Sequence, residues 1–487
     1  MKTTNTIKAK INDQLIEISG EKAFMPLGSF LRNEEALTGT KIVCAEGDCG
    51  ACTVLLAKDL GADGKLNFLP VNSCILPLYL INGAHVVTVE GIAQSKGMQF
   101  DLHEVQKKMV DCNGAQCGYC TPGFICSMVG AVEKIKGSDS NITEKKAKNF
   151  LTGNLCRCTG YQPIIDAMTS IDLNEVTLLK DRYYSDEWVK ELKRLKSQSV
   201  VMNLGDRRLL LPNSLKEACL LKDEDVMIRL IGGSTDVGVV VNKGKLQTPK
   251  AMSLYHISEL SRIIRDENYL IIGANVTLSQ FESYIEKEYP EMAGILHIFA
   301  SPQIKNQATL IGNVVNASPI ADTIPFLMVS DAIVSLQSVK GLREIALPQF
   351  YQGYKKLDLL PNEIVTNIKI PHLKSNEKTK LYKVSMRKDL DISAVTFAAR
   401  IELDDQTKKM TNVKLALGGV AATVLRLPVI ESLLEGKVFD SALFDKAALD
   451  LPSLISPLSD LRASKEYRLK VAQNFLKKFA LEIGGSL

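Results

Sequence analysis

The chain has 487 residues, of which 46% are apolar and 23% charged, a composition typical of globular proteins. Its length allows about three domains with buried cores, and the net charge of +4 is too small to indicate nucleic acid or an anionic membrane as a partner. No apolar run approaches a membrane span, and the N-terminal "MKTTNTIKAKIND" lacks the apolar stretch of a secretory signal. We therefore expect a cytoplasmic protein, in which disulfides are rare.

The first group of cysteines lies in "KIVCAEGDCGACTV" and "NSCILP". Its spacing is Cys44-x4-Cys49-x2-Cys52, followed after 21 residues by Cys74. Plant-type ferredoxins hold a [2Fe–2S] cluster with four thiolates at this spacing. The glycines inside the loop fit a backbone that wraps around a cluster. Buried free cysteines and a zinc site are the alternatives.

The surroundings of this group predict a small ferredoxin-like α+β domain. "TIKAKIND" and "QLIEIS" alternate apolar and polar residues across a turn, which indicates a hairpin. "VVTVEG" at 86–91 is expected to form another strand, and "PLGSFLRNEEALTG" a helix that ends at a glycine.

A second group of cysteines pairs Cys117-x2-Cys120 with Cys156 and Cys158, which are one residue apart in "NLCRCTGYQP". Side chains two residues apart diverge on a strand or a helix, so the two thiols can meet only if the backbone bends sharply. We expect one helix to begin at Thr121-Pro122, a second from Thr143 to Gly153, and a third near Pro163. Both cysteine pairs then precede helix N-termini, which favour an anionic group such as a four-thiolate cluster.

Residues 166–198 are charged and contain no Gly or Pro, and we expect a linker with "KELKRLK" on a solvated helix face. After it, "VMIRLIGGSTDVGVVVN" and "FASPQIKNQATLIGNVVNASPIADTIPFLMVSDA" each combine an apolar strand-like run with a turn rich in Gly, Ser, Thr and Asn. Such turns can bind a phosphate in an α+β domain, although ordinary tight turns look the same. Neither contains G-x-G-x-x-G or a Walker A lysine.

The motifs "CAEGDCGACTV", "QCGYCTPG" and "NLCRCTGYQPI" resemble the iron–sulfur region of the xanthine dehydrogenase family of molybdenum hydroxylases. The resemblance implies two [2Fe–2S] clusters. The first would be held by Cys44, Cys49, Cys52 and Cys74, and the second by Cys117, Cys120, Cys156 and Cys158. Gln116 matches a glutamine that approaches the molybdenum cofactor in the family. Cys112 and Cys126 match no ligand; we interpret Cys126 as a packing residue of a helix face and Cys112 as a bystander.

The two later motifs resemble the family's FAD-binding domain, which grips FAD between two small subdomains. The resemblance implies that the first loop contacts FAD through Leu230, Ile231, Gly232, Gly233, Ser234, Thr235, Asp236 and Val237. The second would contribute Phe299, Ala300, Ala308, Thr309, Gly312, Asn313, Asn316, Ser318 and Asp322, with Phe299 against the isoalloxazine. "NEIVTNIKIP" and "LYKVSMRKDLDISAV" resemble segments that contribute Val365 and Lys383.

The resemblance covers nearly the whole chain and implies a multidomain α+β fold. Its expected parts are a β-grasp ferredoxin-like [2Fe–2S] domain (1–90), an all-helical [2Fe–2S] domain (91–168), a linker (169–198), a two-subdomain α+β FAD-binding domain (199–375) and a C-terminal α+β flavoprotein subdomain (376–487). Fused family members continue into a molybdopterin-binding portion where this sequence stops. We therefore expect the iron–sulfur and FAD subunit of a two-subunit bacterial type, with a large molybdopterin-binding partner and, by analogy, a dimer of heterodimers.

The family implies that the partner hydroxylates hypoxanthine or xanthine at molybdenum, and that electrons pass through the second cluster, the plant-type cluster and FAD to NAD+. This chain then needs no catalytic acid or base, and its five histidines (85, 103, 256, 297 and 372) are expected to be structural. Three alternatives remain open: the same subunit of an aldehyde or N-heterocycle hydroxylase, a stand-alone iron–sulfur flavoprotein carrier or sensor, and a zinc-stabilised scaffold.

Overall fold

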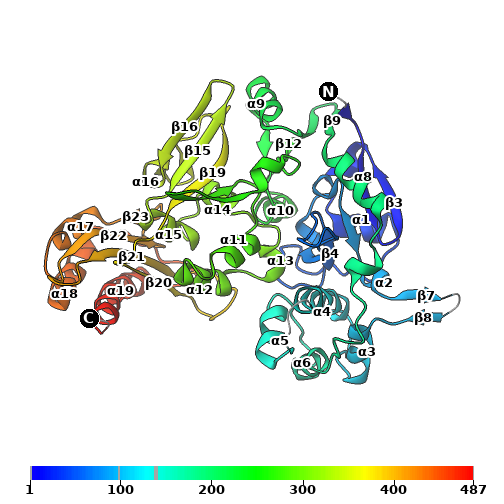
Figure 1. Ribbon diagram of the computed structural model, residues 1–487, viewed down its shortest axis with the longest axis horizontal. Helices are drawn as coiled ribbons and strands as arrows, with labels where there is room; N and C mark the ends of the chain where they lie inside the picture. The colour runs from blue at the N-terminus through cyan, green and yellow to red at the C-terminus, as the bar shows by residue number, and fades with distance from the viewer. Residues whose placement is uncertain (1–2, 97–98, 137–140, 486–487) are drawn as a thin grey trace. The chain divides into compact units, whose positions relative to one another are not determined.

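The computed structural model describes residues 3–96, 99–136 and 141–485, and the chain forms two compact units (Figure 1). Unit 1 consists of Met1–Ala218, Met227–Ser258 and Ser301–Ala308, and unit 2 of Cys219–Val226, Glu259–Ala300 and Thr309–Leu487. Both combine helices with sheets, which confirms the predicted α+β class. Within the described ranges, no helix is both long and apolar enough to cross a membrane.

The N-terminal part of unit 1 is a sheet in the order β3-β2-β6-β4-β5. Its strands are β2 (Ile7–Ile11), β3 (Gln14–Ile18), β4 (Thr53–Ala57), β5 (Leu69–Asn72) and β6 (His85–Val87). The predicted hairpin is confirmed, because β2 and β3 pair antiparallel and Asn12 turns between them with a φ of 53°. Alternate residues of β2 are buried, as the sequence pattern predicts.

Helix α1 (Leu27–Asn33) and the short α2 (Val89–Ile92) accompany this sheet, with 3-10 helices η1 (Gly20–Phe24), η2 (Ser73–Ile75) and η3 (Leu78–Ile81). Two predicted boundaries were wrong. The helix α1 stops before Gly39 because Ala36 already adopts a left-handed conformation, with a φ of 55°. The strand expected over 86–91 ends at Val87, because the Thr88 amide leaves the sheet to bond the Asn12 side chain.

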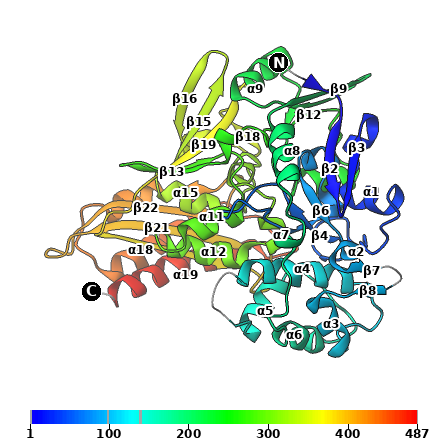
Figure 2. The same cartoon turned by 45° about the vertical axis from the view of Figure 1, so that its right-hand side comes forward.

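The next part of unit 1 is helical (Figure 2). It contains α3 (Glu104–Asp111), α4 (Thr121–Ile135), α5 (Glu144–Leu151) and α6 (Gln162–Thr169), after a hairpin of β7 (Gln94–Lys96) and β8 (Gln99–Asp101). The three predicted helices are confirmed, and the Thr143 hydroxyl caps α5 as expected. Thr121 is the first residue of α4 rather than its N-cap, which is Cys120.

Residues 170–198 contain α7 (Leu179–Arg182) and α8 (Asp186–Lys196). The basic run lies on α8 with Lys190 and Lys193 exposed. The opposite face buries Trp188, Leu192 and Leu195 in the core of the helical part. The segment therefore packs on unit 1 through an amphipathic helix.

A second sheet of unit 1 has the order β1-β9-β10-β12-β11. Its strands are β1 (Thr3–Thr4), β9 (Ser199–Leu204), β10 (Arg207–Leu211), β11 (Arg229–Leu230) and β12 (Lys250–Met252). Helix α10 (Val237–Asn242) follows β11, and α13 (Pro302–Lys305) belongs to the short returning segment. Helix α9 (Leu215–Glu224) begins in unit 1 and ends in unit 2.

Unit 2 begins with a sheet in the order β13-β14-β19-β15-β16. Its strands are β13 (Ile263–Arg265), β14 (Tyr269–Gly273), β15 (Ile333–Ser338), β16 (Gly341–Ala346) and β19 (Ile364–Pro371). It is accompanied by η4 (Ser258–Ser261), α11 (Leu278–Ile285), α12 (Pro290–Phe299), α14 (Leu310–Val315), α15 (Thr323–Val329), α16 (Leu347–Phe350), β17 (Tyr351–Gly353) and β18 (Lys356–Leu357). The apolar run of the second flavin motif was expected as a strand but forms α14, because the Thr309 hydroxyl caps the Gly312 amide.

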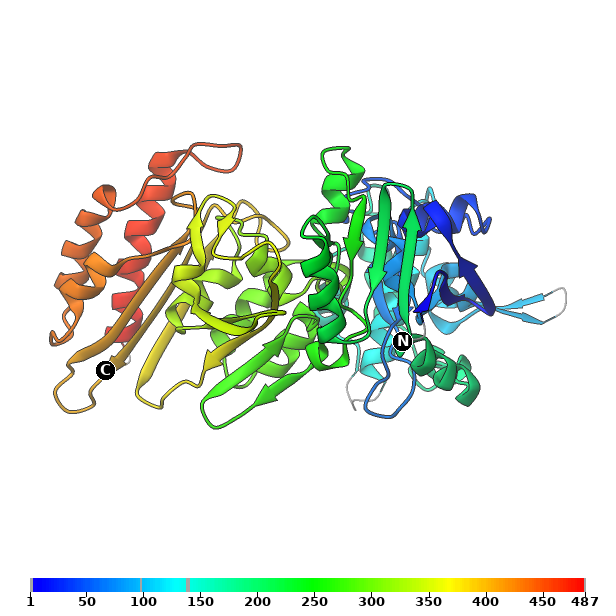
Figure 3. The same cartoon turned by 90° about the horizontal axis from the view of Figure 1, so that it is seen from above.

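The C-terminal part of unit 2 is a sheet in the order β20-β21-β22-β23. It consists of β20 (Glu377–Val384), β21 (Val395–Leu403), β22 (Met410–Gly418) and β23 (Leu425–Arg426). Helices α17 (Pro428–Leu434), α18 (Ser441–Asp450) and α19 (Lys465–Gly484), with η5 (Leu451–Ser453), cover one face (Figure 3). Phe397, Phe475 and Phe479 pack at the centre of that layer.

Candidate cofactor sites

The first four cysteines lie around the N-terminal end of β4. Cys44 and Cys49 are in the loop before this strand, Cys52 directly precedes it, and Cys74 is in η2. The loop has left-handed backbone at Gly47 (φ 80°) and Gly50 (φ 70°), which glycine adopts without strain. The fold therefore brings Cys74 to the segment that carries the other three thiols.

The thiols of this group contact one another in pairs. Hydrogen bonds from Cys49, and next from Cys74, lower the pKa of the Cys44 thiol. The Cys74 thiol likewise lowers the pKa of Cys52. The amide of Glu46 also donates to the Cys44 sulfur at 3.4 Å. Such amide-to-sulfur bonds are a feature of loops that hold iron–sulfur clusters.

The second four cysteines lie before two helices, as predicted. Cys117 and Cys120 precede α4, and Cys156 and Cys158 precede α6. The Tyr119 amide, and next the Cys158 thiol, lower the pKa of Cys117. Burial, and next a hydrogen bond to Cys156, raises the pKa of Cys120 to about 12. The sharp Cys-Arg-Cys bend thus brings the second pair of thiols against the first.

The thiols of each group form two pairs, the arrangement that a two-iron cluster uses. Within the described ranges, no three or more His, Cys, Asp and Glu side chains are placed to hold one metal ion. A [2Fe–2S] cluster needs four thiolates but only two on each iron. The contacts Cys44–Cys49 and Cys52–Cys74 supply two pairs in the first group, and Cys117–Cys158 and Cys120–Cys156 supply two in the second.

The two cysteine loops touch through their backbones. The Leu155 amide donates a 3.0 Å hydrogen bond to the Cys49 carbonyl. A Cβ at Gly50 would lie 2.3 Å from the Gly153 carbonyl oxygen, so only glycine fits at this crossing. The segments that carry the two groups of thiols are therefore in direct contact.

The first predicted flavin loop, residues 230–237, joins β11 to α10 in unit 1. Gly232 and Asp236 are exposed, whereas Ile231 and Ser234 are buried. A Cβ at Gly233 would lie 1.7 Å from the Gln307 carbonyl oxygen and 2.9 Å from the Ala308 amide nitrogen, so the two motifs cross here. Both amide atoms of the buried Gln307 side chain lack a hydrogen-bond partner. An unpaired buried amide is costly, so this cradle fits a polar ligand such as FAD.

The flavin loop is connected to the first cysteine group through α10. At the end of this helix, the Asn242 side chain donates to the Ala45 carbonyl at 2.9 Å and to the Cys74 carbonyl at 2.8 Å. The neighbouring Lys243 forms a 2.8 Å ion pair with Glu46. One short helix thus begins at the predicted flavin loop and ends on the backbone of a predicted cluster ligand.

Unit 2 carries the remaining predicted flavin residues. Six of them lie along α14 and the turn into α15: Thr309 caps α14, Gly312 and Asn313 are on it, Asn316 ends it, Ser318 is in the turn, and Asp322 precedes α15. The Thr323 hydroxyl donates to Asn313 at 2.6 Å, which fixes this side chain. Val365 is buried in β19, against which α14 packs.

Phe299, Asp322 and Lys383 meet in unit 2. The Lys383 ammonium donates to Asp322 at 2.5 Å and to the Asp391 carbonyl at 2.9 Å, and it lies 5.9 Å from the centre of the Phe299 ring. Ala300 directly follows Phe299 at the end of α12. The fold therefore gathers three predicted flavin residues from separate elements.

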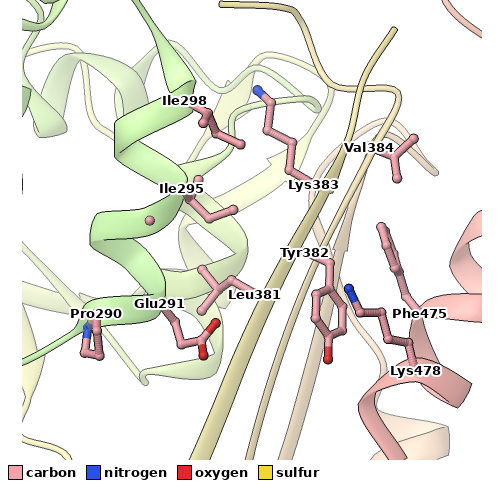
Figure 4. Close-up of a pocket in the computed structure, with 11 residues that line it drawn as sticks. Pro290, Glu291, Ile295, Ile298, Leu381, Tyr382, Lys383, Val384, Phe475 and Lys478 are labelled. Atoms are coloured by element: carbon pink, nitrogen blue, oxygen red, sulfur yellow. The ribbon is translucent and has the colours of Figure 1, made fainter. Parts of the chain in front are cut away.

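Lys383 also lines a cavity of about 480 Å³ between α12, β20 and α19 (Figure 4). In this view Leu381 and Lys383 point toward α12, and Tyr382 points toward α19. The charged groups around the cavity are paired within the protein: Lys478 lies 4.3 Å from the Tyr382 ring centre, and Glu291 binds Lys380 at 2.7 Å. Lys383 is its one lining residue from the predicted flavin set.

Several polar residues of the cofactor motifs were missed by the sequence reasoning. They are Asn154, Asn242, Gln303 and Gln307, all in unit 1. All four lie inside the quoted motifs, and an amide side chain among small residues is the signal that could have identified them. The five histidines take structural roles where the structure gives them partners: His85, for example, is fully buried, and its Nε2 contacts the Asn12 carbonyl at 2.7 Å.

Three family models match the sequence. They are the [2Fe–2S] binding domain over residues 88–169, the FAD binding domain in molybdopterin dehydrogenase over residues 203–373, and the CO dehydrogenase flavoprotein C-terminal domain over residues 380–483. The chain therefore carries a [2Fe–2S]-binding and an FAD-binding domain, as the motifs predict.

Known relatives match most of the chain. It is 30% identical to the xanthine dehydrogenase of Emericella nidulans over 89% of this chain and 35% of that protein. It is also 30% identical to the xanthine dehydrogenase of Oryza sativa subsp. japonica, over 97% of this chain and 40% of that protein. The chain thus spans 35–40% of the length of these relatives.

Solved structures share the fold. Carbon monoxide dehydrogenase from Hydrogenophaga pseudoflava matches with a TM-score of 0.53 and 22% identity, over 55% of this chain and 94% of that chain. Quinoline 2-oxidoreductase from Pseudomonas putida 86 matches with a TM-score of 0.51 and 24% identity, over 56% and 94%. The family assignment comes from the sequence. The iron–sulfur and flavin family models, with the xanthine dehydrogenase relatives, show that the chain belongs to the molybdenum hydroxylase family.

Proposed function

We propose that this chain is the electron-transfer subunit of a xanthine dehydrogenase, with two [2Fe–2S] clusters and FAD, a molybdenum cofactor on a large partner subunit, and NAD+ as acceptor. When bound, the clusters supply one-electron carriers and FAD supplies a centre that exchanges both single electrons and hydride. The protein residues contribute binding, orientation and exclusion of water.

The observation that carries this proposal is the continuity of the three predicted sites within unit 1. The Leu155 amide bonds the Cys49 carbonyl, which joins the second cysteine group to the first. Asn242 bonds the Cys74 carbonyl, which joins the first group to the helix that follows the flavin loop. A stand-alone binding scaffold has no need of such a chain of contacts, whereas electron transfer requires redox centres held at short, fixed separations.

The proposed ligands follow from the thiol contacts. Cys44, Cys49, Cys52 and Cys74 hold the first cluster, and Cys117, Cys120, Cys156 and Cys158 hold the second. The proposed FAD contacts are the residues of the loop 230–237 with Ala308 in unit 1. In unit 2 they are Phe299, Ala300, Thr309, Gly312, Asn313, Asn316, Ser318, Asp322, Val365 and Lys383.

The surface around the second cysteine group supports a partner subunit. Gln116, Cys117 and Cys158 are exposed there. The apolar side chains of Tyr119 and Leu155 are also about half exposed, at 49% and 52%. Exposed apolar residues around a redox site indicate a docking surface. We propose that this face binds the large molybdopterin-binding subunit, in a dimer of heterodimers.

The purine substrate is supported by the names of the relatives, which are xanthine dehydrogenases over 89–97% of this chain. The structural neighbours include carbon monoxide dehydrogenase and quinoline 2-oxidoreductase, whose names indicate other substrates. The substrate site lies on the partner in this proposal, so the partner decides between a purine, an aldehyde and another N-heterocycle.

The test is to co-express the chain with its large subunit and to measure reduction of NAD+ with hypoxanthine, xanthine, an aldehyde and quinoline. The proposal expects turnover with the two purines that requires both subunits. Turnover with the aldehyde or quinoline alone would contradict the purine assignment and keep the electron-transfer role. A chain that neither binds the large subunit nor passes electrons from NADH to an artificial acceptor would contradict both.

A further inference from the structure

The segment Ser301–Ala308 divides the second flavin motif in sequence but packs within unit 1. Its helix α13 lies against β5 and carries Gln303, whose side chain is completely buried. The Gln303 amide nitrogen lies 2.8 Å from Asn154 Oδ1, 3.0 Å from Ser127 Oγ and 3.4 Å from Thr53 Oγ1. These acceptors come from three elements that are far apart in sequence.

Two of these partners lie close in sequence to a predicted cluster ligand. Asn154 lies two residues before Cys156, and Thr53 directly follows Cys52. Both side chains also donate to the Gly50 carbonyl, at 3.1 Å from Asn154 and 2.6 Å from Thr53. The Gln303 amide is therefore the centre of a buried network that reaches the loops of both clusters.

Ser127 links the network to the middle of α4, the helix that follows Cys117 and Cys120. Its hydroxyl donates to Asn154 at 2.7 Å. Two further residues of the segment contact the surroundings of the first cysteine group. Ile304 packs with Cys52 and Cys74, and the Asn306 side chain donates to the Pro70 carbonyl at 2.9 Å.

Stability alone does not account for this arrangement. The Oε1 atom of Gln303 is buried without a hydrogen-bond partner. A buried, half-satisfied amide lowers stability relative to an apolar side chain of similar shape. The amide instead fixes the orientation of its neighbours, because its hydrogen bonds hold the segments that carry cluster ligands. A buried polar network of this kind favours a single arrangement.

We propose that Gln303 is a positioning residue that sets the separation and orientation of the two [2Fe–2S] clusters, and with them the electron exchange between the clusters. The segment that carries it continues along the chain into Thr309 and the rest of the second flavin motif. This inference rests on the proposed two-cluster function.

The test compares electron paramagnetic resonance spectra of reduced wild-type protein with those of Gln303→Met, which keeps the length of the side chain and removes the amide. Two signals from the wild type are required by the proposed function, and their absence would count against that function rather than against Gln303. The matched control is Gln473→Met, which removes a partly buried amide bonded to the Ala448 carbonyl at 2.9 Å in unit 2.

The proposal expects that Gln303→Met keeps the iron content of the wild type but alters the magnetic splitting between the clusters. It also expects a several-fold change in the distribution of electrons between the clusters at half reduction. A tenfold change corresponds to a shift of about 59 mV in the difference between the two reduction potentials, for one-electron couples. Gln473→Met should show neither effect. Wild-type splitting and distribution in Gln303→Met would overturn the proposal.

Ser127→Ala keeps the test decisive if Gln303→Met does not fold, because alanine is well tolerated inside a helix. It removes one partner of Gln303 and should change the splitting in the same direction by a smaller amount. Unchanged spectra in Ser127→Ala would then overturn the proposal. Loss of iron from both variants would also overturn it, because the network would then serve cluster retention rather than cluster spacing.

Discussion

Lys383 and Asp322 form a buried ion pair in unit 2, with side chains only 1% and 3% exposed. The Ser393 hydroxyl donates to the second carboxylate oxygen of Asp322 at 2.5 Å, so both oxygens are bonded. Burial raises the pKa of Asp322, and the Lys383 ammonium opposes this effect. The pair lies beside the Phe299 ring, at the predicted flavin contact of this unit.

Replacement of Lys383 by Met leaves the Asp322 carboxylate buried without its counter-ion. Removal of one partner from a buried pair costs about 3–5 kcal/mol, and we expect a loss of that size in the free energy of unfolding together with loss of bound FAD. Denaturant unfolding and flavin absorbance measure the two effects.

The matched control is Lys380→Met on the same strand, whose pair with Glu291 is about one-third exposed. Exposed pairs contribute about 0–1 kcal/mol, so this variant should keep stability and FAD. Equal losses of stability and of bound FAD in the two variants would contradict the expected contribution of the buried Lys383–Asp322 pair.

Gly50→Ala tests the contact between the two cysteine loops. The added methyl group would lie 2.3 Å from the Gly153 carbonyl oxygen, on backbone with a φ of 70°. We expect a loss of more than about 2 kcal/mol, because the clash adds to the strain of left-handed backbone, which costs about 1–2 kcal/mol. Gly205→Ala has a similar φ of 64° and nothing within 4 Å, so it measures the strain alone. Equal thermal stability of the two variants would contradict the close contact.

The segment that contains α7 should respond to pH through Glu133. Its carboxylate accepts the Leu179 amide at 2.5 Å, and burial raises the pKa of Glu133 to about 7. This pKa lies above the value of about 4.3 in the unfolded chain, so the protonated Glu133 side chain stabilises the folded state. Its contribution to the free energy of unfolding is complete below about pH 4.3 and is lost as the pH rises through about 7. Glu133→Gln keeps an acceptor and removes the titration. The wild type should therefore lose stability relative to this variant between about pH 4.3 and about pH 7; a difference in melting temperature that stays constant with pH would contradict this.

Cys158→Ser should empty the second cluster selectively. We expect iron to fall from about four to about two per chain, because each [2Fe–2S] cluster contains two irons and needs four thiolates. Cys112→Ser is the control, because Cys112 lies outside both groups of thiols and ends α3 with its sulfur 3.7 Å from the Ser170 hydroxyl. Equal iron loss in both variants, measured by metal analysis, would contradict the assigned ligands.

The sequence predicted the elements near the cysteines well because their signals are local. The hairpin of β2 and β3 follows from alternation, and α5 follows from its Thr143 cap. The end of α1 could not be predicted, because Ala36 adopts a left-handed conformation that is typical of glycine or asparagine. The helix α14 was taken for a strand because a short apolar run has no clear period.

The contacts between the sites could not be predicted from local patterns. Gln303 meets Asn154 across 149 positions of sequence, and Asn242 meets the Cys74 carbonyl across 168. Spacing identifies which cysteines form a group, but it contains no information on which distant amide orients the loops. The assignment of residues 301–308 to unit 1, inside a motif of unit 2, likewise arises only from tertiary packing.

The most direct test of the account is the iron, zinc and flavin content of the chain purified without oxygen, combined with electron paramagnetic resonance after reduction. The account predicts about four irons and one FAD per chain, no stoichiometric zinc, and two distinct signals from reduced [2Fe–2S] clusters. Zinc in place of iron, or a single signal with about two irons, would contradict the two-cluster electron-transfer function.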